Sequence, residues 1–186
     1  MAATENKVQF GLKDVHYAVY DEAENTYGTP VPIRGAVNLA LEAEGDMQKF
    51  YADNVAFYVT NTNNGYSGDL EVAKFPEQML QDVWGFVLDA ADKVLIEMDD
   101  AQTVSFALLY RINGDQTDSL FCLYNCTATR PGLGSQTKEE TTEPRTQTVS
   151  ISCVPMSDGK VYARTTKDTP ETIMNGWFDE VYLPSA

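Results

Sequence analysis

The sequence predicts a mainly β protein, an antiparallel sandwich or barrel of about nine or ten strands with one flanking helix. Three observations favour this class. Apolar and polar residues alternate with a period of two in many short runs, as in strands with one buried face. Asn, Asp, Gly and Pro separate these runs at short intervals. Only one segment near the middle has a clear run of apolar residues at helical spacing.

The first predicted strands lie on either side of a turn-rich stretch. Residues 7–20 alternate throughout, and breakers such as Gly28, Pro30 and Gly35 follow them. Residues 36–44 form the next strand. Its apolar side has Val37, Leu39 and Leu41, and its polar side has Asn38, Ala40 and Glu42.

The segment 44–54 lacks the period of a strand, so we expect a loop that joins two long strands. Residues 55–61 alternate again. The pair Asn64-Gly65 then predicts a hairpin turn to a returning strand at 69–75. The polar positions of that strand are Asp69 and Glu71.

A helix is predicted over residues 76–84, because Pro76 suits a first helical position and Gly85 ends the run. Further strands follow at 103–112 and 118–130, joined by an Asn-Gly turn, then at 145–154 and 160–166. A short hairpin is expected within 86–98, turning at 89–93. A short C-terminal helix is expected to start near Thr169 or Pro170, and 130–145 is a polar loop.

Composition limits the classes of function. The 186 residues suit a single domain, 1–186, and carry 28 acidic against 13 basic residues, a net charge of −15. DNA binding through phosphate neutralisation needs clustered Lys and Arg, so it is disfavoured. No membrane span or signal peptide is apparent, so we expect a chain made in the cytosol with free thiols at Cys122, Cys126 and Cys153.

The search for catalytic chemistry finds little. The single histidine, His16, lies in a strand pattern and is interpreted as structural. Cys122 and Cys126 are four residues apart in a strand, about 13 Å, which is too far for one metal ion or a disulfide. Acidic pairs such as Asp99-Asp100 have no spacing typical of a glycosidase or an EF-hand. We therefore expect no enzyme, no catalytic residue, no metal and no cofactor.

Several runs, taken in order, carry a family likeness. They are KVQFGLKDVHYAVY, YGTPVPIRGAVNLALEAEGD, FYADN, NNGYSGDLEVA, FALLYRINGD, LYNCTATRP, KEETTEPRTQTVSIS and DGKVYART, with a closing W-x-x-x-VY-x-P at Trp177 to Pro184. Together they cover nearly the whole chain and resemble the major tail protein of long-tailed, siphovirus-type bacteriophages. The segment 85–100 departs from that pattern.

The resemblance implies a virion structural protein, made in the host bacterial cytoplasm. Its subunits would form hexameric rings that stack into a hollow tail tube, with strands from six subunits completing an inner barrel. It also implies partners: the tape measure protein, the tail terminator and the distal tail or baseplate proteins. Double-stranded DNA would pass through the tube without specific binding, and no membrane is involved.

Charge and pattern suggest which residues would perform these tasks. Carboxylates repel phosphates, so the polar faces of two strands are candidates to line the lumen: Asn38, Glu42, Asp69 and Glu71. The expected loop 44–54 is the candidate for ring stacking, with Asp46, Met47, Phe50 and Tyr51. Two terminal arms, 1–7 and 178–186, are further contact candidates.

Two other functions stay open. A carbohydrate-binding or adhesin-like β-sandwich shares the strand pattern and the aromatic richness of ten Tyr, eight Phe and two Trp. A tube of a related contractile or secretion system would share the fold. Polymerisation separates the first from a tail tube, because a glycan-binding module stays small.

Overall fold

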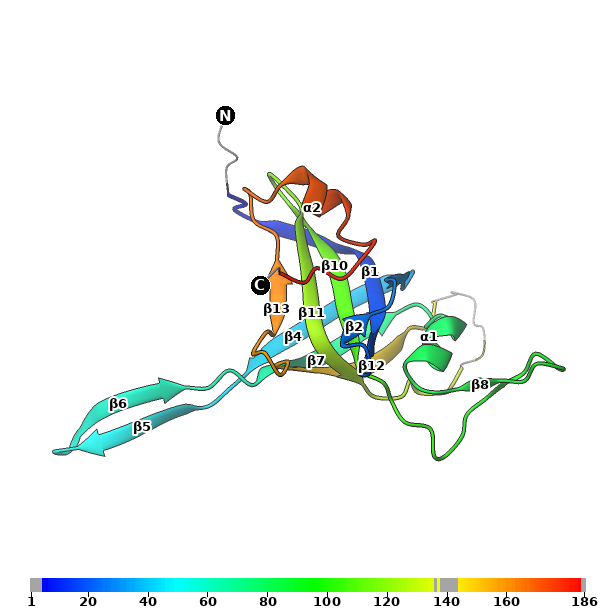
Figure 1. The fold of residues 1–186 in the computed structure, drawn as a ribbon, viewed down its shortest axis with the longest axis horizontal. Coiled ribbons are helices and arrows are strands. Elements are labelled where there is room, and N and C mark those ends of the chain that lie inside the picture. Colours follow the sequence, from blue (N-terminus) through cyan, green and yellow to red (C-terminus); the bar gives the residue numbers. More distant parts are fainter. Residues whose placement is uncertain (1–4, 136, 138–143, 185–186) are drawn as a thin grey trace.

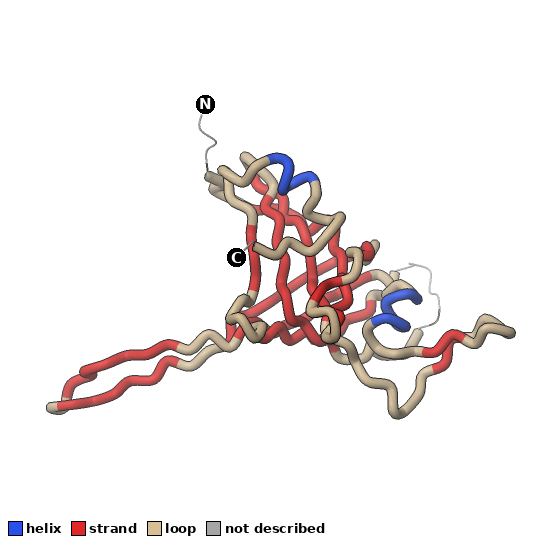
Figure 2. The backbone as a smooth tube through the Cα atoms, in the orientation of Figure 1, coloured by secondary structure: helices blue, strands red, loops and turns tan. Residues whose placement is uncertain are grey.

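The protein is mainly β, as predicted (Figures 1 and 2). The computed structural model describes residues 5–135, 137 and 144–184, and this part contains thirteen strands and two short helices. The elements are β1 (Gln9–Asp21), β2 (Thr26–Tyr27), β3 (Val31–Pro32), β4 (Ala36–Glu44), β5 (Met47–Ala52), β6 (Val55–Asn61), β7 (Gly65–Val72), α1 (Glu77–Asp82), β8 (Val87–Leu88), β9 (Leu95–Ile96), β10 (Phe106–Gly114), β11 (Ser119–Ala128), β12 (Gln147–Val154), β13 (Tyr162–Arg164) and α2 (Glu171–Asn175).

One antiparallel sheet dominates the body. Its strand order is β2-β1-β10-β11-β12-β7-β4, with β13 added to β11 and β3 added to β1. The long strand β11 changes partner along its length: residues 121–123 pair with β13, and residues 125–128 pair with β12. The sheet therefore turns over on itself, and Figure 1 shows β1, β10 and β11 crossing β4, β7 and β12.

The main core lies between these two halves of the sheet. Leu70, Val149 and Ile151 from one half meet Tyr17 and Leu108 from the other. Burial of these apolar side chains is the main favourable term in holding the two halves together.

The helix α1 closes one end of this core with Met79, and the buried Trp84 follows it. The Trp84 indole donates hydrogen bonds to the carbonyl oxygens of Ala128 (3.2 Å) and Thr129 (3.0 Å). The helix begins at Glu77, one residue later than predicted, because Pro76 is in an extended conformation. Neither helix in the described part is long and apolar enough to span a membrane.

A second core cluster covers the other side of β10 and β11. Trp177 and Val181, which follow α2, pack there, and the Trp177 indole donates to the Phe121 carbonyl oxygen (3.2 Å). The Tyr124 hydroxyl donates to the Tyr182 carbonyl oxygen (2.8 Å). Much of the predicted C-terminal arm thus lies along its own sheet.

Parts of the two terminal arms and of the polar loop 130–145 lie outside the described residues. These parts are 1–4 of the N-terminal arm, 136 and 138–143 of the polar loop, and 185–186 of the C-terminal arm. In the described part of the N-terminal arm, the Asn6 side chain donates to the Thr117 carbonyl oxygen (2.7 Å) and accepts from two backbone N–H groups. Whether any of these segments contacts another subunit stays a prediction.

Segment 44–54 is not the irregular loop that the sequence suggested. Residues 47–52 form β5, which pairs with β6, and β7 pairs with β4 and not with β6 as expected. The four strands make one long hairpin whose outer half projects from the body (Figure 1). The sequence of β5 does not alternate between apolar and polar residues because nearly all of the strand is exposed. A strand with no buried face does not need apolar residues at every second position.

Two glycines allow the close approach of strands where the projecting half leaves the body. A Cβ on Gly65, at φ +104°, would lie 1.9 Å from the Cys153 carbonyl oxygen. A Cβ on Gly45 would lie 2.0 Å from the Thr62 carbonyl oxygen. No side chain fits at either position without moving backbone.

One side-chain assignment in β4 was wrong. Val37, expected on the apolar face, is 54 % exposed. The pairing of β4 with β7 is irregular between Ala36 and Asn38, so Val37 is an extra residue in the strand. Ala36 packs against the core in its place, together with Leu39 and Leu41.

Candidate functional site

The four lumen candidates come together on one face of the sheet. Asn38 lies directly opposite Glu71, and Ala40 lies opposite Asp69. Glu42 follows on the same face, two residues along β4. The other side of both strands packs into the core through Leu39, Leu41 and Leu70. The alternation therefore produces an apolar inner face and an acidic outer face, as the sequence predicted.

The next strand extends this face with hydroxyl groups. Thr148, Ser150 and Ser152 of β12 lie opposite Glu71, Asp69 and Ser67 of β7. The Ser150 hydroxyl donates to the Asp69 carboxylate (2.8 Å), which fixes that carboxylate on the surface. Sequence analysis missed this row, because the pairing of β12 with β7 joins segments about eighty residues apart and has no local signal.

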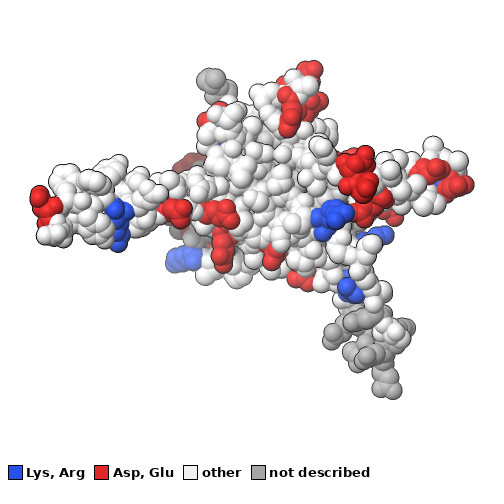
Figure 3. Space-filling model, turned by 90° about the horizontal axis from the view of Figure 1, so that it is seen from below, with Lys and Arg blue, Asp and Glu red and all other residues white. Residues whose placement is uncertain are grey.

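Positive charge is absent from all three strands. The segments AVNLALEAE, GYSGDLEV and QTVSISCV contain Glu42, Glu44, Asp69 and Glu71 but no Lys or Arg. A shallow hollow of 660 Å³ lies over β7, β11 and β12, and Arg130 at its rim pairs with Glu97. Seen from below, both carboxylates and Lys or Arg side chains lie on the body between the two projecting arms (Figure 3). We call the outward side of β4, β7 and β12 the acidic face; it repels polyanions and offers hydroxyl groups to water.

The outer half of the long hairpin is the second feature. It is formed by β5 and β6, and Lys49 is the one charged residue within the two strands. Its large apolar residues are between 48 % and 72 % exposed: Met47, Phe50, Tyr51, Val55, Phe57, Tyr58 and Val59. Figure 3 shows this arm mostly white, with a red end. Exposed apolar surfaces of this kind are typical of contact sites.

The stacking candidates lie on or next to this hairpin. Met47, Phe50 and Tyr51 belong to β5, and Asp46 immediately precedes it, where its N–H bonds the Thr62 hydroxyl (2.9 Å). The residues of β6 were not among the predicted contacts, although Phe57 is the most exposed aromatic residue there. Its run VAFYVTN has apolar residues on both faces of the strand. This pattern was the one feature of the sequence that could have predicted an additional apolar contact surface.

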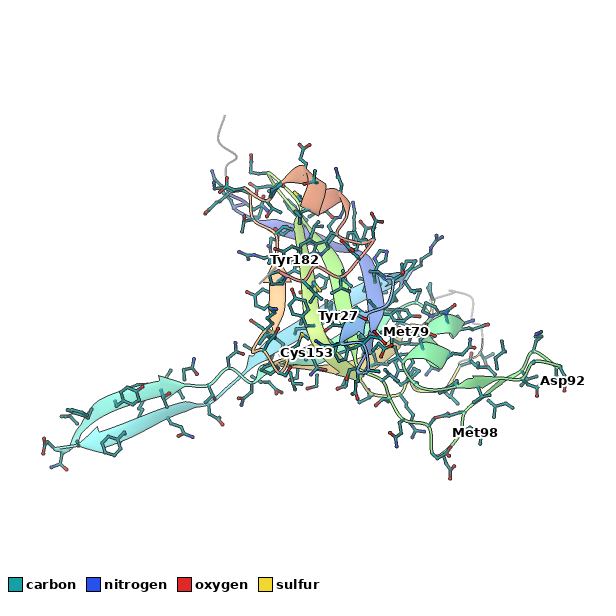
Figure 4. All side chains as sticks on the ribbon, in the orientation of Figure 1. Tyr27, Met79, Asp92, Met98, Cys153 and Tyr182 are labelled. Atoms are coloured by element: carbon teal, nitrogen blue, oxygen red, sulfur yellow. The ribbon has the colours of Figure 1, made fainter. Side chains whose placement is uncertain are left out.

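A second arm projects from the other side of the body. The strands β8 and β9 pair as the predicted short hairpin, with Asp89 and Val94 bonded across the turn (2.8 Å). Figure 4 shows Asp92 at the outer end of this arm, far from Cys153 in the body. Its apolar residues include Val87, which is 52 % exposed. Sequence analysis predicted the turn but not the exposure.

The cysteines are free and buried. Cys126 of β11 lies opposite Cys153 of β12, and their Sγ atoms are 2.6 Å apart. Burial and the contact with Cys153 raise the pKa of the Cys126 thiol well above its ordinary value. Burial also raises the pKa of the Cys122 thiol. Both are structural thiols, as expected, although the Cys126–Cys153 pairing was not predicted.

Other candidate chemistry is sparse. His16 stacks on Phe178, with ring centroids 4.6 Å apart, and its Nδ1 lies 2.9 Å from the Asp14 carbonyl oxygen. Within residues 5–135, 137 and 144–184, no cluster of three or more His, Cys, Asp or Glu side chains could hold a metal ion.

Comparisons with known proteins give only weak similarities to solved structures. No protein-family model matches the sequence, and no curated protein matches it significantly. The anti-feeding prophage cap, a tube-terminating cap, is 13 % identical with a TM-score of 0.47, covering 88 % of this chain and 96 % of the cap. A sheath–tube complex from an extracellular contractile injection system, PVC, is 11 % identical with a TM-score of 0.42, covering 82 % of this chain and 88 % of that one. The sheath/tube terminator of the same system is 11 % identical with a TM-score of 0.39, covering 86 % and 99 %.

Values this low do not establish a shared function.

Proposed function

We propose that the chain is a structural subunit of a phage-type tail tube and has no enzymatic activity. Copies assemble as hexameric rings that stack into a hollow tube, with the acidic face toward the lumen. The observation that carries the proposal is the projecting β5–β6 hairpin, whose seven large apolar residues find no core in their own chain. Apolar surface of this extent is stable in water when another molecule covers it.

The open edge of the sheet supports the same proposal. The strand β4 ends the strand order, so its outer backbone groups have no ladder partner within the described residues. Exposed sheet edges lead to unwanted pairing unless they are covered. In a closed ring, the exposed sheet edge of each subunit is covered by the neighbouring subunit. A closed ring therefore has no exposed sheet edge.

The acidic face suits a conduit for DNA. Carboxylates repel phosphates and hydroxyl groups bring no positive charge, whereas Lys and Arg at these positions would bind the phosphates. The proposed partners are other copies of this chain, the tape measure protein during assembly, and terminator and distal tail or baseplate proteins at the two ends. The chain would belong to a virion or a virion-like tube. A tube of a related contractile or secretion system would fit the same observations.

Electron microscopy of the purified full chain tests the proposal. We expect rings or tubes by negative stain, with a sedimentation coefficient that rises with protein concentration. A chain that stays monomeric at tens of micromolar and binds glycans would refute it and favour the carbohydrate-binding alternative.

A further inference from the structure

A groove opens where β1 and β4 face each other. No hydrogen-bonded ladder joins these strands in the described part of the chain. The groove has a volume of 480 Å³, and its walls include Phe10, Val37, Leu41, Tyr110 and Ile112. Phe10 is 59 % exposed and Val37 is 54 % exposed, so the sandwich shows apolar side chains along this edge.

A smaller hollow of 160 Å³ continues the groove, because Leu41 and Tyr110 line both. Its walls add Phe121 and Tyr162. The Tyr110 and Phe121 rings stack in parallel with centroids 5.0 Å apart. The Arg164 guanidinium lies 5.9 Å from the Phe121 centroid at the end of this aromatic wall. We call the two hollows together the edge groove.

The hairpin of the same chain does not fill the edge groove. It continues outward from the ends of β4 and β7 and points away from the body (Figure 1). Each chain therefore presents one apolar groove and one apolar hairpin that do not meet. A contact between two different surfaces of identical chains repeats from copy to copy, which is how an open polymer grows.

The two surfaces match in chemistry. The hairpin contains an aromatic cross-strand pair, Phe50 opposite Tyr58, and the groove has an aromatic wall to receive such rings. The hairpin turn has an acidic residue, Asp53, and the groove ends at the positive Arg164. We propose that the β5–β6 hairpin of a second copy lies in the edge groove. This inference rests on the proposed function and names the acceptor for the hairpin.

A photo-crosslinker in place of Phe57 tests the contact directly. The residue is 72 % exposed in the single chain, so the full-length variant Phe57→p-benzoylphenylalanine folds normally. Isotope-labelled and unlabelled chains are mixed and irradiated, and the cross-linked peptides are mapped by mass spectrometry. We expect links between copies to residues 9–13, 36–41 or 162–164. The matched control carries the crosslinker at Val87 on the other arm, and it should not label these segments.

The outcomes separate the two proposals. Rings or tubes whose links fall outside the edge groove, or form only within one chain, overturn the inference and leave the tube function standing. A chain that neither assembles nor cross-links between copies overturns both.

Charge substitutions give an independent readout. The substitution Val37→Glu blocks the groove, and Phe57→Glu blocks the hairpin, both at exposed positions. Each variant alone should fail to form tubes. In a mixture of the two variants, the intact hairpin of Val37→Glu can bind the intact groove of Phe57→Glu. The mixture should therefore form pairs of copies, or pairs of rings, and no longer polymer. Normal tubes from Val37→Glu would contradict the inference.

Discussion

Replacing Phe57 by serine should separate assembly from folding. The side chain lies outside both core clusters, so the unfolding free energy should stay within about 0.5 kcal/mol of the parent. In the proposed polymer the same side chain would be covered by another copy. Full burial of a Phe is worth up to about 3 kcal/mol, and 72 % of this residue is available, so each contact should weaken by about 2 kcal/mol, or about 30-fold in affinity.

The assay is the critical concentration for polymer formation, measured by sedimentation and light scattering. Thermal unfolding of the single chain is followed in parallel. The matched control is Leu133→Ser, which removes an apolar residue that is 91 % exposed elsewhere on the surface. An unchanged critical concentration for Phe57→Ser would refute the reasoning, as would a fall of more than 1 kcal/mol in the unfolding free energy.

Three further predictions concern the body of the subunit. The Tyr17 hydroxyl donates to the Asp82 carboxylate (2.8 Å), so Tyr17→Phe should lower the unfolding free energy by about 1–3 kcal/mol in urea, with an unchanged m-value. Because burial raises the pKa of the Cys126 thiol, it should stay unreactive toward a thiol reagent at pH 8 and react once urea unfolds the chain; fast labelling of the native protein would contradict this. Lysine at Glu42, Asp69 and Glu71 together, but not the matched amides Gln, Asn and Gln, should cluster positive charge on the acidic face and make the chain retain DNA at low salt and release it as salt rises, in a filter-binding assay.

The acidic face could be predicted because one side of β4 and β7 is buried. Burial imposes alternation, and alternation assigns Glu42 and Asp69 to the other side. The width of the face could not be predicted, because Ser150 reaches Asp69 only through the pairing of β12 with β7. The cysteine pair has the same origin, since the register of β11 and β12 brings together residues 27 apart.

The projecting hairpin shows where the prediction of strands from alternating apolar and polar residues fails. A strand exposed on both faces has no buried side, so Met47–Ala52 has no alternation and was predicted as a loop. The bulge at Val37 had no signal either, because an extra residue changes the side of one side chain without altering the composition. Both features lie where the chain would meet its proposed neighbours, and in the proposed polymer the partner would cover side chains that the chain's own core does not cover.

A cryo-electron microscopy reconstruction of the polymer tests the central claim most directly. We predict a hollow tube in which Glu42 and Asp69 of every subunit line the lumen. A tube with these carboxylates on its outer wall would contradict it.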